Sequence, residues 1–138
     1  MGQQHKQIGE VAERTGLSLR TIRYYEEVGL ITPSARSTGG FRLYTEGDIA
    51  RLMLVKRMKP LEFSLDEMRD LLGTLDALDD DDTAATERGA LLDRLDTFRT
   101  AAEDRCGALR KQLETAEGFA ESLRTELTQH RRGGSSDE

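Results

Sequence analysis

The chain has 138 residues, of which 36% are apolar and 33% charged, with no Trp and only seven Phe and Tyr. So few aromatic residues favour an elongated helical molecule over one compact core. A single Cys excludes an internal disulfide, and no segment has the roughly 20 apolar residues of a membrane span. The start, MGQQHKQIGE, lacks the apolar run of a signal peptide, so we expect a soluble, cytoplasmic protein without a membrane partner.

The net charge of −6 is divided unevenly along the chain. Residues 1–59 carry ten Lys and Arg against six Asp and Glu, a net charge of +4, whereas residues 60–138 carry ten against twenty, a net charge of −10. Only the part of a protein that meets phosphates must be basic, so a basic head on an acidic remainder is typical of a nucleic-acid binder.

Two short helices are predicted near the start of the chain. In residues 8–16, IGEVAERTG, apolar residues recur at i, i+3 and i+4, and Gly16 ends the helix. Ser18 is placed to cap the second helix, residues 19–29, which Gly29 terminates. Two helices joined by so tight a turn form a helix-turn-helix, whose second, recognition helix enters a DNA major groove.

The recognition helix, LRTIRYYEEVG, combines arginines with two adjacent tyrosines. We expect Leu19, Ile22 and Val28 to face inward. Arginine pairs with guanine edges or phosphates, and a tyrosine hydroxyl can donate to a phosphate. The alternative is that the arginines are merely solvated and a tyrosine belongs to the core; we expect mixed roles, with Tyr25 in the core. Four side chains then face outward: Arg20, Thr21, Arg23 and Tyr24.

A β-hairpin is predicted next, in LITPSARSTGGFRLYT, where β-prone runs flank Ser-Thr-Gly-Gly. A hairpin after a helix-turn-helix is a wing, and Arg36 and Arg42 lie on its two arms. A plain surface hairpin is the alternative, but arginines flanking a glycine turn favour contact with the DNA backbone. Thr45 with Asp48, and Ser64 with Glu67, are capping boxes that begin two further helices.

A long helix without proline is predicted over residues 84–130, about 70 Å at the usual helical rise. Its apolar residues recur in steps of three and four, with one stutter between Ala102 and Cys106, which predicts a nearly straight helix. Such a narrow stripe needs a partner, and the simplest is a second copy. This dimerisation stripe comprises Leu91, Leu95, Phe98, Ala102, Cys106, Leu109, Leu113, Ala116, Ala120, Leu123 and Leu127.

The chain therefore divides into five expected segments. They are a disordered N-terminus, 1–7; a winged helix-turn-helix DNA-binding domain, 8–75; an acidic linker, 76–83; a dimerisation helix, 84–130; and a disordered tail, 131–138.

Three stretches carry a family resemblance: IGEVAERTGLSLRTIRYYEEVGLI, GGFRLYTEGDIARL and FSLDEMRDLL. In order and spacing they resemble the DNA-binding head of the MerR-type transcription regulators. The resemblance implies a mainly α fold, in which a winged helix-turn-helix head is followed by a long helix that pairs as an antiparallel coiled coil. It implies DNA contacts from the recognition helix and from the wing at Arg20, Thr21, Arg23, Tyr24, Arg36, Arg42 and Tyr44.

The resemblance also implies a mechanism. A homodimer would bind double-stranded, pseudo-palindromic promoter DNA whose spacer is overlong, then bend and untwist it so that RNA polymerase can engage. The expected function is thus sequence-specific transcriptional regulation.

Metal and cofactor sites are not expected. Metal-sensing members of the family carry cysteines at the start of the long helix, where this chain reads DDDDTAATERG. His5 and His130 lie toward the ends of the chain, without ligand neighbours. Cys106 has three possible roles, namely packing within the dimerisation stripe, a redox switch, or a metal ligand; we expect packing, since a buried Cys usually behaves as a small hydrophobe.

Three other functions are alternatives to transcriptional regulation. An enzyme would need convergent polar groups, and the sequence has no Ser-His-Asp set, phosphate loop or metal cluster, so we expect none. An architectural or recombination-accessory protein, similar to excisionases, would share the winged head; however, such proteins tend to be short and to assemble head to tail. A dimeric coiled-coil adaptor would bind other proteins and show no salt-sensitive DNA binding.

Overall fold

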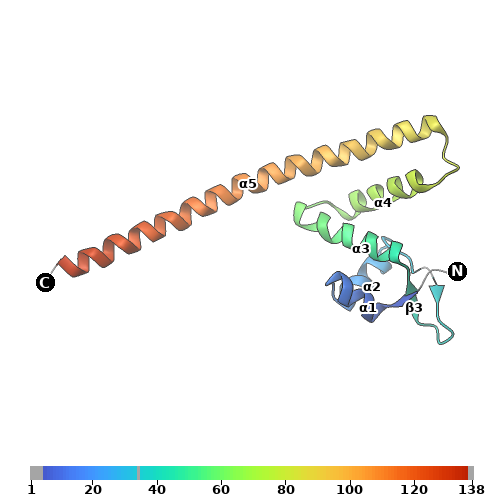
Figure 1. The fold of residues 1–138 in the computed structure, drawn as a ribbon, viewed down its shortest axis with the longest axis horizontal. Helices are drawn as coiled ribbons and strands as arrows, with labels where there is room; N and C mark the ends of the chain where they lie inside the picture. The colour runs from blue at the N-terminus through green and yellow to red at the C-terminus, as the bar shows by residue number, and fades with distance from the viewer. Residues whose placement is uncertain (1–4, 34, 137–138) are drawn as a thin grey trace. The chain divides into compact units, whose positions relative to one another are not determined.

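The computed structural model describes residues 5–33 and 35–136 (Figure 1). The chain divides into two compact units, Met1–Asp96 and Thr97–Glu138. The first unit holds a helix-turn-helix, a small sheet, two further α-helices joined by a 3-10 helix, and the beginning of the last helix, α5, Ala85–Ser136. The predicted mainly α fold with a winged head and a long C-terminal helix is confirmed.

The two helices of the helix-turn-helix are α1, Ile8–Thr15, and α2, Leu19–Glu27. Gly16 follows α1 in the left-handed conformation, with φ of +74°, which glycine adopts without steric cost. Its N–H donates to the Ala12 carbonyl, as is usual at a helix C-terminus. At the start of α2 the Ser18 hydroxyl oxygen accepts a hydrogen bond from the Thr21 N–H at 3.0 Å. Both predicted ends are therefore confirmed.

The wing belongs to a three-stranded antiparallel sheet with the order β1-β3-β2. Strands β2, Ala35–Arg36, and β3, Arg42–Tyr44, form the predicted hairpin. Strand β1, Lys6–Gln7, pairs with the other edge of β3, although residues 1–7 were expected to be disordered. Two residues are too few to show a strand pattern, and it is the pairing with β3 that orders them. The remainder of that expected segment, residues 1–4, lies outside the described residues.

Two capped helices and a short 3-10 helix complete the head. Helix α3, Glu46–Met58, and helix α4, Leu65–Asp79, each begin at a predicted capping box, and η1, Lys59–Leu61, joins them. Helix α4 continues four residues beyond the expected domain end at Leu75, so the expected acidic linker is partly helical. The helix is extended because the Thr83 hydroxyl donates to the Ala77 carbonyl at 2.7 Å and closes its last turn.

The core of the head lies where α1, α2, α3 and β3 meet. Figure 1 shows these four elements close together. Burying each large apolar side chain stabilises the fold by about 1.5–3 kcal/mol. The apolar side chains with almost no exposed surface come from all four elements, and they are Val11, Ile22, Tyr44, Leu52 and Val55.

The base of α5 is held to α4 by side chains. Helix α5, Ala85–Ser136, begins after a short turn at residues 80–84. The Arg88 guanidinium donates to the Leu78 carbonyl at 2.8 Å, and Arg94 forms an ion pair with Asp70. These contacts anchor the first three turns of α5 within the same compact unit as the head.

The remainder of α5 is an uninterrupted helix with an apolar stripe. The helix has 52 residues and runs to Ser136, so the tail that was expected to be disordered from residue 131 is helical to Ser136. Residues 137–138 lie outside the described residues. Four leucines of the dimerisation stripe are exposed in the single chain: Leu109, Leu113, Leu123 and Leu127. Among the described residues, no helix is both long and apolar enough to cross a membrane.

Candidate nucleic-acid interface

The recognition helix α2 separates its two tyrosines as predicted. Tyr25 is buried, with 4% of its surface exposed, whereas Tyr24 is 46% exposed. Their rings lie 5.8 Å apart, centre to centre, in a tilted arrangement. Arg20 and Arg23 are exposed on the same helix, and Thr21 is half-buried beside the capping Ser18. The four expected contact residues are therefore together near the start of α2.

Leu19 differs from the expectation that it faces inward, because 40% of its surface is exposed. Successive helical residues turn by about 100°, so Leu19 lies about 120° from Tyr25 around the helix axis. Ile22 and Tyr25 occupy the buried side instead. An exposed leucine beside arginines has the apolar character that contacts thymine methyl groups.

The expectation for Tyr44 is also wrong. It was expected to contact DNA from the wing, but its side chain is fully buried, and its hydroxyl donates to Glu26 Oε2 at 2.9 Å. Alternate residues of a strand share a face, so Tyr44 and Arg42 both point toward α2. Burial, together with the hydrogen bond to Glu26, raises the pKa of Tyr44 to about 12.

This pKa predicts a loss of stability at alkaline pH. Between pH 10 and about 12 the unfolded chain loses the Tyr44 proton while the folded head keeps it, so the free energy of unfolding falls as pH rises through this window. Urea unfolding at a series of pH values from about 9 to 12 measures the slope. Tyr44→Phe should flatten it; Tyr25, whose pKa is also raised by burial, accounts for part of the remainder. An unchanged slope in the variant would contradict the prediction.

The wing presents two arginines and one aromatic ring. The Arg36 guanidinium donates to the Gly40 carbonyl at 3.1 Å across the hairpin turn. Arg42 Nε lies 2.8 Å from Glu26 Oε1 as an ion pair, without the alignment of a hydrogen bond. Phe41, next to it, is strongly exposed, and its position directly after Ser-Thr-Gly-Gly is the sequence signal that could have identified it.

A hollow of about 420 Å³ adjoins the recognition helix. Lys59 of η1 lines this hollow together with Arg20 and Tyr24 of α2. Lys59 was not predicted as a contact residue, although the basic run KRMK at residues 56–59 was a signal for it. The lining residues are Arg20, Thr21, Tyr24, Tyr25, Lys59, Phe63, Leu65 and Met68.

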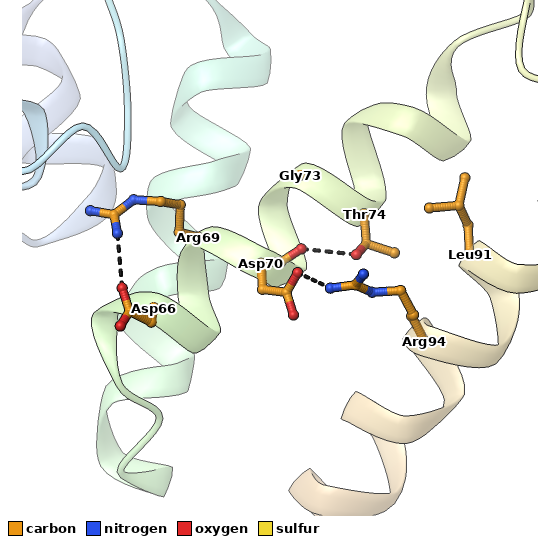
Figure 2. Close-up of a pocket in the computed structure, with 7 residues that line it drawn as sticks. All are labelled: Asp66, Arg69, Asp70, Gly73, Thr74, Leu91 and Arg94. Atoms are coloured by element: carbon orange, nitrogen blue, oxygen red, sulfur yellow. Dashed lines mark hydrogen bonds and ion pairs between the residues drawn. The ribbon is translucent and has the colours of Figure 1, made fainter. Parts of the chain in front are cut away.

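A second hollow, of about 450 Å³, lies between α4 and the base of α5 (Figure 2). Arg69 points toward Asp66, Arg94 points toward Asp70, and the Thr74 hydroxyl donates to the Asp70 carbonyl. These arginines and carboxylates neutralise one another, so the hollow is less suited to a charged ligand. Within residues 5–33 and 35–136, no group of three or more His, Cys, Asp and Glu could hold a metal ion.

A side chain of α4 holds the C-terminus of the recognition helix in place. Arg69 Nη2 donates to the Val28 carbonyl at 2.5 Å, and Gly29 follows with φ of +75°. The Leu30 N–H donates back to the Tyr25 carbonyl at 2.9 Å. Both ends of α2 are thus held, so its exposed face has a defined orientation in the head.

Comparison with known proteins identifies the family. Residues 7–75 match the model of the MerR HTH family regulatory protein, which covers half of the chain. The chain belongs to the MerR family. The match begins at the end of β1 and ends within α4, so it includes the helix-turn-helix, the wing and the capped helices that follow.

Similar proteins are found at both sequence and structure level. The mercuric resistance operon regulatory protein of Bacillus cereus is 45% identical over 69 residues, 50% of this chain and 52% of that protein. The chain thus spans about half the length of the curated relatives it matches. A MerR family transcriptional regulator from Bacillus cereus has a TM-score of 0.56 and 27% identity, covering 85% of this chain and 76% of that chain.

A third similar protein was solved with DNA. This protein is HiNmlR, described as a MerR family regulator lacking the sensor domain, bound to promoter DNA. Its structure has a TM-score of 0.57, and the match covers 96% of this chain and 94% of that chain. At 22% identity this likeness concerns the fold alone.

Proposed function

We propose that the chain is a sequence-specific transcriptional regulator that binds pseudo-palindromic promoter DNA as a homodimer and distorts it. The observation that carries this proposal is the recognition helix, which is fixed at both ends and presents exposed Arg20, Arg23 and Tyr24. Membership of the MerR family favours this function over that of a recombination-accessory protein. Such a regulator acts in the cytoplasm with RNA polymerase as its further partner.

The recognition helix supplies the sequence-reading contacts. Arg20 and Arg23 are one turn apart on the exposed side of α2, so both can enter the same major groove and pair with guanine edges or phosphates. The Ser18 hydroxyl donates to the Thr21 hydroxyl oxygen at 2.9 Å, which orients Thr21 at the helix start. Tyr24 is positioned to donate to a phosphate, and Leu19 to contact a thymine methyl group.

The wing and η1 supply backbone contacts on either side of the recognition helix. Arg36 and Arg42 extend from the two arms of the hairpin, and Phe41 lies between Arg42 and the turn. Lys59 adds a cation beside α2 from η1. Contacts of this kind set the register of a protein on the duplex and give its affinity a strong dependence on salt.

The stripe on α5 is the proposed dimer interface. Its leucines from Leu109 to Leu127 are exposed in the single chain, and a soluble helix does not keep so long an apolar stripe in water without cost. Pairing with the same stripe of a second copy, in the antiparallel direction, covers it. Two heads joined in this way read two half-sites, which is why the proposed DNA is pseudo-palindromic. In such a dimer Cys106 packs as one member of the stripe.

In vitro selection tests the proposed function. The full chain is incubated with a library of random duplexes, and bound sequences are recovered and titrated at several salt concentrations. We expect one enriched sequence with two-fold symmetry, and an affinity that falls linearly on a double-logarithmic plot against salt. Gel mobility with the site placed at different positions in a fragment measures bending.

Two variants sharpen this test. Lys59→Gln should reduce the salt slope by about one unit, since one phosphate contact is lost. Arg110→Gln makes the same charge change on an exposed part of α5 and should leave the slope unaltered. If no symmetric sequence is enriched, the proposed function is wrong.

A further inference from the structure

One carboxylate joins the recognition helix to the wing. Glu26, in the last turn of α2, accepts a hydrogen bond from the Tyr44 hydroxyl at Oε2, and its Oε1 lies 2.8 Å from Arg42 Nε. The Glu26 side chain is only 13% exposed, whereas that of Arg42 is 37% exposed. Both partners come from the same face of β3, so one acid fixes the strand that carries the wing arginine.

The charge of Glu26 is unfavourable for a surface that must approach phosphates. A carboxylate near DNA repels it, and Coulomb interactions alone would make a neutral residue bind more tightly. The contact that Glu26 makes, however, involves the Nε edge of Arg42. A guanidinium is a planar fork of five N–H donors, so an acid at Nε leaves the end formed by Nη1 and Nη2 for a phosphate.

We propose that Glu26 is a positioning residue, which holds Arg42 by its Nε and thereby presents the Nη1 and Nη2 end to a DNA phosphate. An arginine ordered in advance loses less rotational freedom when DNA binds. Tyr44 completes the arrangement, because its buried hydroxyl fixes the second carboxylate oxygen and so the direction in which the first one points. The proposal rests on the DNA-binding function proposed above.

Glu26→Gln tests this proposal, because it has two effects on DNA affinity with opposite signs. Loss of the negative charge removes a repulsion from DNA and should raise affinity, whereas release of Arg42 should lower it. The change keeps the size of the side chain and an oxygen for Tyr44, but it removes the charge that holds Arg42. We expect affinity for the selected site to fall about fivefold, within the range of couplings between contacting residues. Glu27→Gln, the neighbouring exposed acid, makes the same charge change and should leave affinity unchanged or higher. Tighter binding by Glu26→Gln would overturn the proposal.

A double-mutant cycle separates positioning from stability. In an Arg42→Ala background, Glu26→Gln has no arginine to release, so it should no longer weaken binding and should tighten it slightly. An equal weakening in both backgrounds would mean that Glu26 acts through the stability of the head, and would overturn the route through Arg42. Thermal unfolding of each variant checks that the head is folded.

A measurement without DNA keeps this inference distinct from the proposed function. Nitrogen-15 relaxation at the Arg42 Nε site should give a higher order parameter than at the exposed Arg20, and Glu26→Gln should lower it to the level of Arg20. Equal order parameters for the two arginines in the unaltered chain would overturn the positioning role. Failure of the unaltered chain to select DNA, with Arg42 ordered, would instead contradict only the proposed function.

Discussion

We expect Leu113→Asp to convert a dimer into a folded monomer and to lower affinity for the two-fold symmetric site by about a hundredfold or more. Leu113 is 58% exposed in the single chain, so the change costs the monomer little. In the proposed dimer it would place a carboxylate inside the stripe, where an unpaired buried charge is strongly unfavourable. With the two heads no longer joined, each half-site is bound alone.

Light scattering after size exclusion measures the assembly, and fluorescence anisotropy measures the affinity. Thr115→Asp is the matched control, because it introduces the same residue about 200° further round the helix from Leu113, away from the stripe. Thr115 is exposed, and its variant should remain a dimer. A monomeric Leu113→Asp chain with full affinity would disprove the link between pairing and DNA binding.

Arg23→Ala should weaken binding to the selected site by about 1–3 kcal/mol and relax the preference at one base pair. The side chain is exposed on α2, whose two ends are fixed, so its loss should leave the fold of the head intact. Repeating the titration against duplexes with single base-pair changes locates the position that no longer matters.

The comparison for this variant is Arg110→Ala, which removes an arginine from an exposed part of α5. It should retain both the affinity and the base preference of the unaltered chain. If Arg23→Ala weakens all duplexes equally, Arg23 contacts only phosphates, and the base-reading role belongs to another residue of the helix.

Features that depend on neighbouring residues were predictable from the sequence. The turn at Gly16, the cap at Ser18 and the capping box of Thr45 with Asp48 each act over a few residues, and the structure has all of them. The apolar spacing of α5 predicted a helix for the same reason, since one residue every three or four is a local signal.

Features that depend on contacts between distant segments were not predictable. Tyr44 was expected to contact DNA because the resemblance to the MerR-type regulators implied contacts from the wing at this position. Its position is decided by Glu26, 18 residues earlier, which accepts its hydroxyl. Lys59 reaches the recognition helix only because η1 turns the chain back toward it. Strand β1 likewise exists through its pairing with β3, which no pattern in two residues could indicate.

The anchoring of α5 to α4 has a consequence for native-state amide exchange. Because Arg88 and Arg94 hold the first three turns to α4, the hydrogen-bonded amides of residues 88–96 should exchange only when the head opens. Beyond Asp96, protection should depend on pairing and therefore on protein concentration. One helix without any break in its hydrogen bonding then has two levels of protection, and the boundary between them marks where the head's stability ends and that of the dimer begins.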